Sequence, residues 1–400
     1  MKPNLSRRQF LVHSASFAGA SLGLGVARPG RGEGAMTEMR IGFIGVGDRG
    51  KSLLGALLRN ARDGRGPCAR VVAIADVNPA HLKRALEIAR ESGGAASDTG
   101  GAPVRGFTNY RALLDEKDLD AVFIATPVHL HAAQAITSIA SGRHVYLEKP
   151  VAGSAEECRQ VLAVAREVQG AGQIVQIGLQ RRYNARYRTS IRFVKEGGAG
   201  NVLFVRAQWH AAGSSPRNKP WLFQKEKSGD IVVEQACHQF DVFNWLFDAT
   251  PERACGFGGT SRFLNDPPGR DTMDHYGAVL EYPRGIRVHL SHVSFAIPDR
   301  RFSGIYELVF GDSMGVDLSS SLAWSESGET RRLDSGSDAS APRGGSDTQS
   351  AVEAFLESIA TRTPPEASVE AGCRATMAAL LCQRALETGR AISWNELYPA

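Results

Sequence analysis

The chain has 400 residues, which is too long for one ordinary domain and predicts about two or three. With 42% hydrophobic and 22% charged residues, the composition is globular and excludes a disordered chain, a collagen-like fibre and a multi-span membrane protein. The formal net charge of +5 raises the question of a polyanionic partner, so the positions of these charges must be considered first.

The first 27 residues have the features of an export signal. Arg7-Arg8 lie within a Ser-Arg-Arg-Gln-Phe-Leu-Val stretch that matches the twin-arginine pattern, and a weakly apolar stretch ends at Gly25-Val26-Ala27, an acceptable cleavage site. We therefore expect a twin-arginine (Tat) signal peptide over 1–27, a spacer over 28–38 and a periplasmic or otherwise exported protein. The apolar stretch is too short and too interrupted for stable membrane insertion. The alternative is a translation start at Met36 or Met39.

Removal of this signal changes the interpretation of the net charge. Residues 1–27 contain three basic residues and no acidic one, so the charge falls from +5 to +2. The remaining basic residues are scattered and do not alternate with aromatic residues, so we expect no nucleic-acid partner.

From Arg40 onward, continuous apolar runs alternate with helical segments. Such runs are typical of parallel strands buried on both faces, and the βαβαβ order predicts a doubly wound parallel sheet, a Rossmann domain over 39–152. A Gly/Ala/Ser-rich insertion, 92–106, is expected to be a mobile surface loop. The predicted strands are Ile41–Ile44, Val71–Ala75, Ala121–Ala125 and His144–Leu147.

After Pro150 the pattern changes. Ser154 and Glu157 form a capping box that opens a helix, and later segments have the period-two character of a largely antiparallel sheet. We expect a second α/β domain over 153–348 and C-terminal helices over 349–390 that pack back onto the first domain. The predicted strands of this part are Ile174–Ile177, Val202–Trp209, Ala254–Thr260, Tyr276–Tyr282, Ile286–Phe295 and Ile305–Phe310.

A G-x-G-x-x-G motif follows the first predicted strand directly and opens a helix. It reads Gly45-Val46-Gly47-Asp48-Arg49-Gly50, and this strand–turn–helix context is typical of a dinucleotide-binding loop. Asp76 ends the second strand, where a carboxylate accepts hydrogen bonds from ribose hydroxyls and repels a 2′-phosphate. The pattern favours NAD over NADP as cofactor. The alternative is an ordinary glycine-rich turn.

Two further motifs follow the next strands: Ala125-Thr126-Pro127-Val128-His129-Leu130-His131 and His144-Val145-Tyr146-Leu147-Glu148-Lys149-Pro150. Together with the glycine loop they resemble the Gfo/Idh/MocA family of nicotinamide-dependent sugar and polyol oxidoreductases. The resemblance implies a C-terminal α/β domain with a large, open, mainly antiparallel sheet and a homo-oligomer, a dimer or tetramer. It also implies a cofactor bound along Gly45–Gly50, Asp76, Thr126, Pro127, His131, Glu148 and Lys149.

A third constellation lies within 228–241. If this segment is one helix, Glu234, His238 and Asp241 share a stripe at i, i+4 and i+7. The matching family element usually has Asp where Glu234 stands. Zinc is the alternative for this stripe, but nothing supplies a second ligand motif, so we expect no metal.

Each residue of this constellation, together with Lys149, has an expected role in the oxidation of a sugar hydroxyl. His238 is the expected general base, because its ordinary pKa is near operating pH. Glu234 is expected to hold its tautomer or bind a hydroxyl, and Lys149 to stabilise the alkoxide and relay the proton. The expected substrate-binding residues are Arg182, Tyr183, Trp209, Trp221 and Asp241, with core packing as the alternative for the two tryptophans.

The expected location bears on the reaction. Little free NAD exists outside a cell, so we expect an exported enzyme to carry tightly bound NAD through a closed cycle of reduction and reoxidation. Sugar–sugar oxidoreduction fits this cycle. An NAD-dependent glycoside hydrolase that oxidises, eliminates and reduces in turn is the first alternative, and a non-catalytic NAD-binding sensor is the second.

Overall fold

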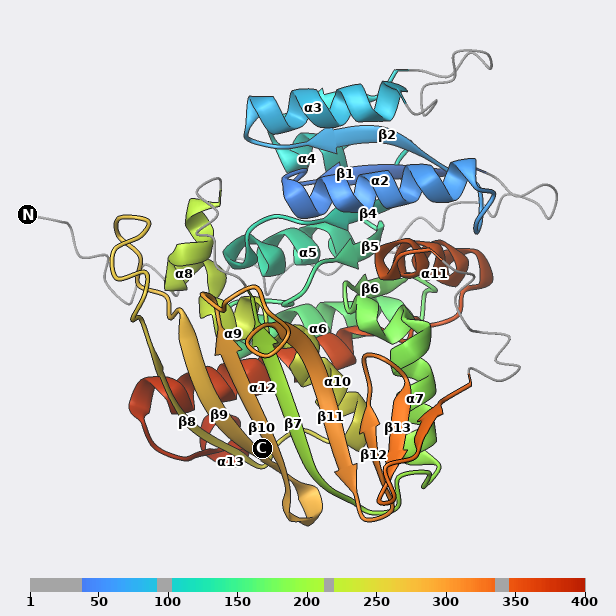
Figure 1. Ribbon diagram of the computed structural model, residues 1–400. Helices are drawn as coiled ribbons and strands as arrows, with labels where there is room; N and C mark the ends of the chain where they lie inside the picture. Colours follow the sequence, from blue (N-terminus) through green and yellow to red (C-terminus); the bar gives the residue numbers. More distant parts are fainter. Residues whose placement is uncertain (1–37, 92–102, 212–218, 335–344, 400) are drawn as a thin grey trace, which may run out of the picture. The chain divides into compact units, whose positions relative to one another are not determined.

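The computed structural model describes residues 38–91, 103–211, 219–334 and 345–399, and within them two sheets organise the chain (Figure 1). The first sheet has six parallel strands in the order β3-β2-β1-β4-β5-β6. The predicted doubly wound sheet is thereby confirmed. Its strands are β1 (Met39–Ile44), β2 (Ala69–Ala75), β3 (Arg105–Phe107), β4 (Ala121–Ile124), β5 (His144–Leu147) and β6 (Val175–Ile177).

The strand order reverses between β1 and β4, and this reversal positions the site. In such sheets a crevice opens outside the carboxyl ends of the strands at the switch point. The glycine motif follows β1 at this point, and the Thr126-Pro127 turn follows β4. The crossover helices are α2 (Asp48–Arg62), α3 (Pro79–Ala89), α4 (Tyr110–Leu114), α5 (His131–Ala140) and α6 (Ala155–Gln169).

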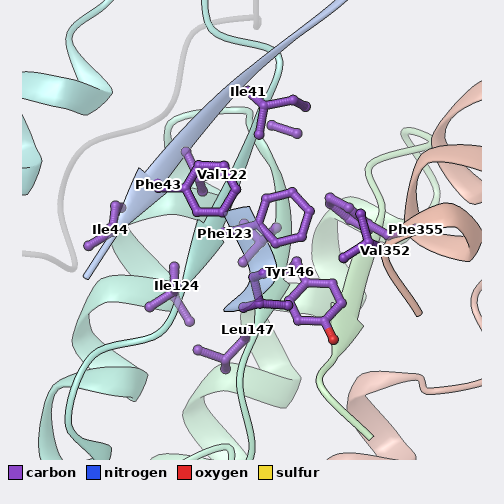
Figure 2. Close-up of a cluster of buried hydrophobic side chains, with 14 of the residues drawn as sticks. Ile41, Phe43, Ile44, Val122, Phe123, Ile124, Tyr146, Leu147, Val352 and Phe355 are labelled. Atoms are coloured by element: carbon purple, nitrogen blue, oxygen red, sulfur yellow. The ribbon is translucent and has the colours of Figure 1, made fainter. Parts of the chain in front are cut away.

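Aromatic side chains fill the centre of the first core (Figure 2). The rings of Phe43 and Phe123 stack with centroids 4.9 Å apart, and Tyr146 stacks on Phe123 at the same distance. Phe355 of α11 (Asp347–Thr361) packs edge-on against Phe123 and Tyr146, with centroids 5.3 and 5.6 Å apart. A helix that follows β14 in sequence, far from the strands of the first sheet, therefore completes the core of that sheet.

The second sheet has nine strands in the order β14-β13-β12-β11-β7-β10-β9-β8-β15. All its pairs are antiparallel except β10 with β7, so the predicted mainly antiparallel sheet is confirmed. Its strands are β7 (Val202–His210), β8 (Arg253–Gly259), β9 (His275–Tyr282), β10 (Ile286–Val293), β11 (Gly304–Gly311), β12 (Met314–Asp317), β13 (Leu322–Ser325), β14 (Thr330–Arg332) and β15 (Ile392–Ser393).

Helices cover one face of this sheet. α12 (Val369–Thr388) contacts β8, β9 and α10 (Cys237–Phe247) of this layer. It also contacts α6, a helix of the first domain, so α12 joins both layers. The remaining helices of this part are α7 (Ala185–Lys195), α8 (Lys225–Ser228), α9 (Asp230–Glu234), α10 (Cys237–Phe247), α12 (Val369–Thr388) and α13 (Trp394–Leu397). Four short 3₁₀ turns are η2 (Val128–Leu130), η3 (Gln180–Tyr183), η4 (Pro220–Phe223) and η5 (Pro283–Gly285).

The structure departs from the sequence expectations in three places. β3 occupies the end of the predicted 92–106 loop, and its glycine and exposed arginine gave no apolar run. The parallel sheet takes in β6, beyond residue 152 where we expected the first domain to end. The short strands β12 to β15 have no predicted counterpart, because two to four residues are too few to show a period. Residues 1–37, with the predicted signal peptide, lie outside the described residues.

Among the described residues, no helix combines the length and the apolar character that a membrane span requires.

The packing of Phe355 predicts how strongly α11 stabilises the first core. We expect Phe355→Ala to lower the free energy of unfolding by about 3–5 kcal/mol, because a fully buried ring leaves a cavity among aromatic neighbours. Urea unfolding followed by circular dichroism measures the change. Phe302→Ala, at a ring that is 51% exposed, is the matched control and should cost less than about 1 kcal/mol. Equal losses in the two variants would contradict the assigned role of α11.

Candidate functional site

The glycine loop has the backbone that a close-lying ligand requires. Gly45 has φ +82°, and a Cβ there would lie 2.7 Å from the Thr126 side chain. A Cβ at Gly50 would lie 2.0 Å from the carbonyl oxygen of Gly45, so helix α2 approaches the turn closely only because this residue is glycine. A Cβ at Gly47 would meet nothing nearer than His81 at 4.0 Å, so this backbone lies open to the adjacent cavity.

One cavity of about 760 Å³ extends from this loop to the second domain. The carboxyl ends of β1, β2, β4 and β5 supply one wall, and the segment from Lys219 to His238 supplies the other. Of the residues expected to bind cofactor, the following line it: Gly45, Gly47, Asp48, Arg49, Asp76, Thr126, Pro127, His131, Glu148 and Lys149. The size and the glycine cradle fit an extended dinucleotide.

Val46 and Gly50 lie behind the cavity wall. The Val46 side chain is fully buried in the first core, but its backbone N–H donates to Oδ2 of Asp76 over 2.7 Å. The other carboxylate oxygen of Asp76 accepts from the N–H of Asn78 at 2.8 Å. Asp76 therefore fixes the glycine loop against the end of β2 while it faces the cavity.

Arg49 ties the glycine loop to three other parts of the chain. Its Nε donates to Oε1 of Glu148 at 2.7 Å, and Nη1 donates to Oγ1 of Thr348 in α11 at 2.9 Å. Nη2 donates to Oε1 of Gln180 in η3. Glu148 is thus committed to Arg49, and its contribution to the site is to hold this arginine in place.

Lys149 follows β5 and precedes a cis proline peptide bond, and its side chain crosses the cavity. Its Nζ donates to the backbone oxygen of Glu234 at 2.6 Å and to Oε1 of the same residue at 3.0 Å. Glu234 therefore holds the ammonium group from two directions. The longer side chain found here in place of aspartate contacts the lysine rather than standing free in the cavity.

His238 lies at the same end of the cavity, and its ring stacks on Trp209 with centroids 6.5 Å apart. Its Nδ1 is buried without a hydrogen-bond partner among the described residues. Burial lowers the pKa of His238 well below its usual 6.5, and the nearby charges of Lys149, Arg181 and Arg49 lower it further. The ring is therefore neutral at neutral pH.

The predicted single helix over 228–241 is broken. α9 ends at Glu234 and α10 begins at Cys237, with Gln235 and Ala236 between them. Glu234 and His238 still line the cavity together, but Asp241 does not. The fully buried Asp241 carboxylate accepts from Nη2 of Arg182 at 2.7 Å.

The expected substrate-binding residues separate into two groups. Trp221 lines the cavity, whereas Arg182, Tyr183, Asp241 and Trp209 do not. The Tyr183 hydroxyl accepts from the N–H of Ala367 at 3.2 Å, and Arg182 is paired with Asp241. These contacts hold Arg182, Tyr183 and Asp241 within the later part of the chain, and a substrate-binding role for them stays a prediction. Trp209 lies outside the cavity lining and stacks on the His238 ring.

His131 lines the cavity, yet both of its ring nitrogens are used. Nδ1 lies 2.6 Å from the carbonyl oxygen of Pro150, and Nε2 lies 2.8 Å from that of Thr126. The ring joins the turns that follow β4 and β5 and leaves no nitrogen for a ligand. His131 therefore shapes the cofactor wall rather than offering it a hydrogen bond from the imidazole.

The sequence reasoning missed several residues of the cavity wall. Lys219, Gln180 and Gln235 face it from the second part of the chain, and His81 faces it from α3. None of them belongs to a spaced motif, so only the fold brings them there. Within the described ranges, no group of three or more His, Cys, Asp and Glu side chains is arranged to hold a metal ion.

Comparisons with known proteins agree with this geometry. Residues 39–178 match the oxidoreductase family model with an NAD-binding Rossmann fold, and residues 187–312 match the Gfo/Idh/MocA C-terminal domain. Inositol 2-dehydrogenase from Salmonella paratyphi B is 26% identical over 210 residues, 52% of this chain and 55% of that protein. The chain thus spans about half the length of the curated relatives it matches.

Solved structures share the fold. The scyllo-inositol dehydrogenase of Lactobacillus casei, with bound NAD(H) and scyllo-inositol, superposes with a TM-score of 0.70 at 19% identity, covering 90% of this chain and 99% of the other. The aldose-aldose oxidoreductase of Caulobacter crescentus, complexed with glycerol, gives 0.72 at 18% identity, covering 89% and 100%. Since the two family models together match more than half of the sequence, the chain belongs to the Gfo/Idh/MocA oxidoreductase family, with its NAD-binding Rossmann domain followed by the family's C-terminal domain.

Proposed function

We propose that the protein is an exported NAD-dependent oxidoreductase that acts on a CH–OH group of a sugar, glycoside or polyol. The observation that carries the proposal is the single cavity with the glycine loop and Asp76 at one end and Lys149, Glu234 and His238 at the other. Relatives of this chain bear the names of inositol dehydrogenases, and a structural neighbour is an aldose-aldose oxidoreductase, which supports a polyhydroxylated substrate.

The residues at the far end of the cavity are suited to moving one proton. Bound NAD supplies the acceptor for the hydride that leaves the substrate carbon. His238 is neutral and takes the hydroxyl proton, a role worth about 100- to 10,000-fold in rate. The Lys149 ammonium stabilises the negative charge that develops on the substrate oxygen, and Glu234 keeps this ammonium in position.

The acidic end of β2 favours NAD over NADP. The Asp76 carboxylate faces the cavity, where it attracts ribose hydroxyls and repels a 2′-phosphate. Lys83 and Arg84 of α3, the nearest basic pair in the sequence, do not line the cavity. Arg84 instead pairs with Glu87 at 3.2 Å.

We further propose that the protein forms a homo-oligomer, a dimer or tetramer, through the sheet face that its own helices leave open. Phe204 and Phe310 lie side by side on neighbouring strands there, with centroids 5.7 Å apart, and Phe310 is 44% exposed. Exposed apolar groups of this kind are typical of association surfaces. Light scattering of the purified chain measures the state directly, and a monomer at micromolar concentration would exclude this part of the proposal.

The experiment for the proposed function follows bound cofactor at 340 nm while candidate sugars and aryl glycosides are added. We expect sugar-dependent reduction without aglycone release. His238→Ala should bind NADH within about twofold of the wild type but lower the reduction rate by about 100- to 10,000-fold, because only the base is lost. His129→Ala, an exposed histidine next to the cavity, is the control and should retain wild-type turnover.

Three other results of this experiment would contradict the proposal. Aglycone release with no net reduction would identify the NAD-dependent glycoside hydrolase instead. Bound NAD without a response to any sugar would identify a sensor. Near wild-type turnover of the His238→Ala variant would remove the base assigned to that residue.

The lowered pKa of His238 predicts the pH dependence of the reaction. The neutral ring accepts the proton, so kcat/KM should stay constant as the pH falls from 8 to 6.5 and decline only below the usual histidine value. A profile of kcat/KM between pH 4.5 and 8.5 at saturating NAD tests this. A half-maximal point at or above 6.5 would show that the surrounding cations do not act on His238 as described.

The export part of the proposal depends on Arg7 and Arg8. In a host with a twin-arginine pathway, the full chain should appear in the periplasm, shortened at or near Ala27. Replacing both arginines by lysine should retain the unshortened chain in the cytoplasm, because the pathway requires the arginine pair. Lys2→Gln is the control and should leave export unchanged. Cytoplasmic retention of the unaltered chain would favour a start at Met36 or Met39.

A further inference from the structure

One segment of the second part of the chain reaches the cavity at both of its ends. Lys219 and Trp221 line the wall near the glycine loop, and Glu234 and His238 line it where the chemistry is proposed. The four residues lie between the end of β7 and the first turn of α10. This segment therefore spans the cavity from its cofactor end to its substrate end.

Lys219 contacts the first turn of α2. Its Nζ lies 3.0 Å from Oδ2 of Asp48, the first residue of that helix and a residue of the G-x-G-x-x-G motif. The N-terminus of this 15-residue helix, following the glycine turn, is where backbone N–H groups attract a dinucleotide pyrophosphate. The ammonium group of Lys219 thus lies beside the expected position of that pyrophosphate.

A cation beside Asp48 offsets the charge of its carboxylate. An acidic side chain next to a pyrophosphate repels it, and two lysines flank this one. Lys51, within α2, approaches Oδ1 at 3.6 Å but does not line the cavity, whereas Lys219 does. Of these two lysines, Lys219 is the one that combines proximity to Asp48 with access to the cavity.

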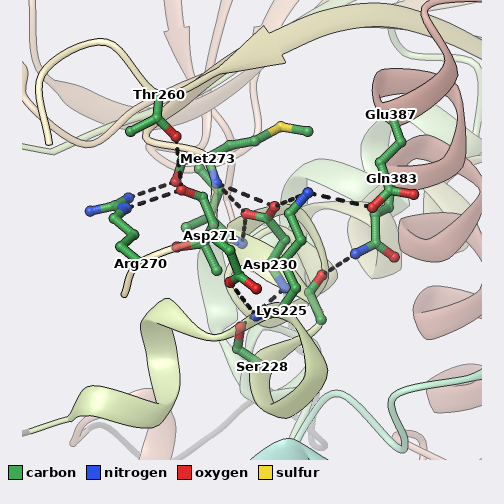
Figure 3. Close-up of polar contacts among 12 residues, drawn as sticks. Lys225, Ser228, Asp230, Thr260, Arg270, Asp271, Met273, Gln383 and Glu387 are labelled. Carbon is green, nitrogen blue, oxygen red and sulfur yellow. Dashed lines mark hydrogen bonds and ion pairs between the residues drawn. The ribbon is translucent and has the colours of Figure 1, made fainter. Parts of the chain in front are cut away.

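The segment that carries Lys219 is fixed from the side of the second sheet (Figure 3). The carbonyl oxygen of Phe223 accepts from the N–H of Asp271 at 3.1 Å, and the Arg270 guanidinium lies 5.0 Å from the centre of the Phe223 ring. The side chain of Asp271 in turn accepts from the N–H of Lys225 at 2.7 Å. These contacts limit the freedom of the chain that presents Lys219.

Asp230, the first residue of α9, anchors this helix to the loop that precedes β9. Its buried carboxylate accepts from the N–H of Met273 at 3.0 Å and from that of Ile231 at 2.7 Å (Figure 3). Asp230 has φ +71°, a left-handed conformation that a non-glycine residue adopts only when its surroundings hold it there. One anchored loop thereby sets the position of both Lys219 and Glu234.

We propose that Lys219 is a cofactor-binding residue whose ammonium group contacts the pyrophosphate of bound NAD and slows its release. The proposal rests on the proposed NAD binding and adds to it a cation supplied by the C-terminal domain. When the dinucleotide is bound, Lys219 is shared between Asp48 and the phosphates, so cofactor binding joins the two domains across the cavity. An enzyme that works where free NAD is scarce requires such slow release.

The test measures NADH binding and release by fluorescence in the full chain, independently of turnover. Lys219→Gln should raise the dissociation constant and the release rate at least about tenfold, since a hydrogen bond to a charged group is lost. Lys219→Arg should restore binding to within about threefold. The affinity of the wild type should fall with added salt more steeply than that of Lys219→Gln, because screening weakens the contact.

Two variants separate the cation from its ion pair. Lys51→Gln removes an equal charge beside the same carboxylate and should change NADH binding less than about twofold. Asp48→Asn should leave binding unchanged or make it tighter, because it removes a repulsive charge and frees Lys219. Equal weakening by Asp48→Asn and Lys219→Gln would show that the ion pair alone holds the cofactor, and would overturn the assignment.

The outcomes also distinguish this inference from the proposed function. If the wild type binds NADH and Lys219→Gln binds it equally well, the assignment of Lys219 fails while the oxidoreductase proposal stands. If the wild type binds no NADH, both fail.

Discussion

The ion pair between Lys149 and Glu234 is the contact on which the candidate site depends. Lys149 stands at the end of a strand of the parallel sheet, and Glu234 ends a short helix that covers the second sheet. Both side chains are largely withdrawn from solvent, so the charge of each must be compensated by the other. Removing either partner would leave a buried charge without compensation. The position of Lys149 in the candidate site therefore depends on how the two domains pack against each other.

Two further ion pairs, each within one domain, also compensate a buried carboxylate. Arg49 binds Glu148 within the first domain and also reaches Thr348 of α11, while Arg182 binds Asp241 within the second. Each pairs a cation with a carboxylate that is almost fully buried. These arginines thus serve internal contacts rather than a surface for a polyanion. Arginine suits this use, because its planar group binds several acceptors at once.

The parallel sheet and the glycine loop of the cavity could be predicted from the sequence, because each depends on residues that are close together along the chain. Strands such as Ile41–Ile44 and Ala121–Ile124 are continuous apolar runs, and the glycine loop follows the first of them directly, so neighbouring residues carry the whole signal. The break between Glu234 and Cys237 has no such signal, since neither glycine nor proline marks it. The contact between Arg182 and Asp241, 59 positions apart, forms only in the folded chain, so the sequence did not predict it. The position of Lys219 beside Asp48 could not be predicted from the sequence for the same reason.

The setting of His238 has a consequence for the direction of the reaction. Burial and three nearby cations favour the neutral ring, so a proton taken from a substrate hydroxyl is held weakly. A weakly held proton is readily given back, which makes protonated His238 a strong acid toward a carbonyl oxygen. If bound NAD were recycled by a second sugar, the carbonyl oxygen of that sugar would have to take up a proton, and protonated His238 would supply it. One histidine of lowered pKa could then act as base in one half-reaction and as acid in the other.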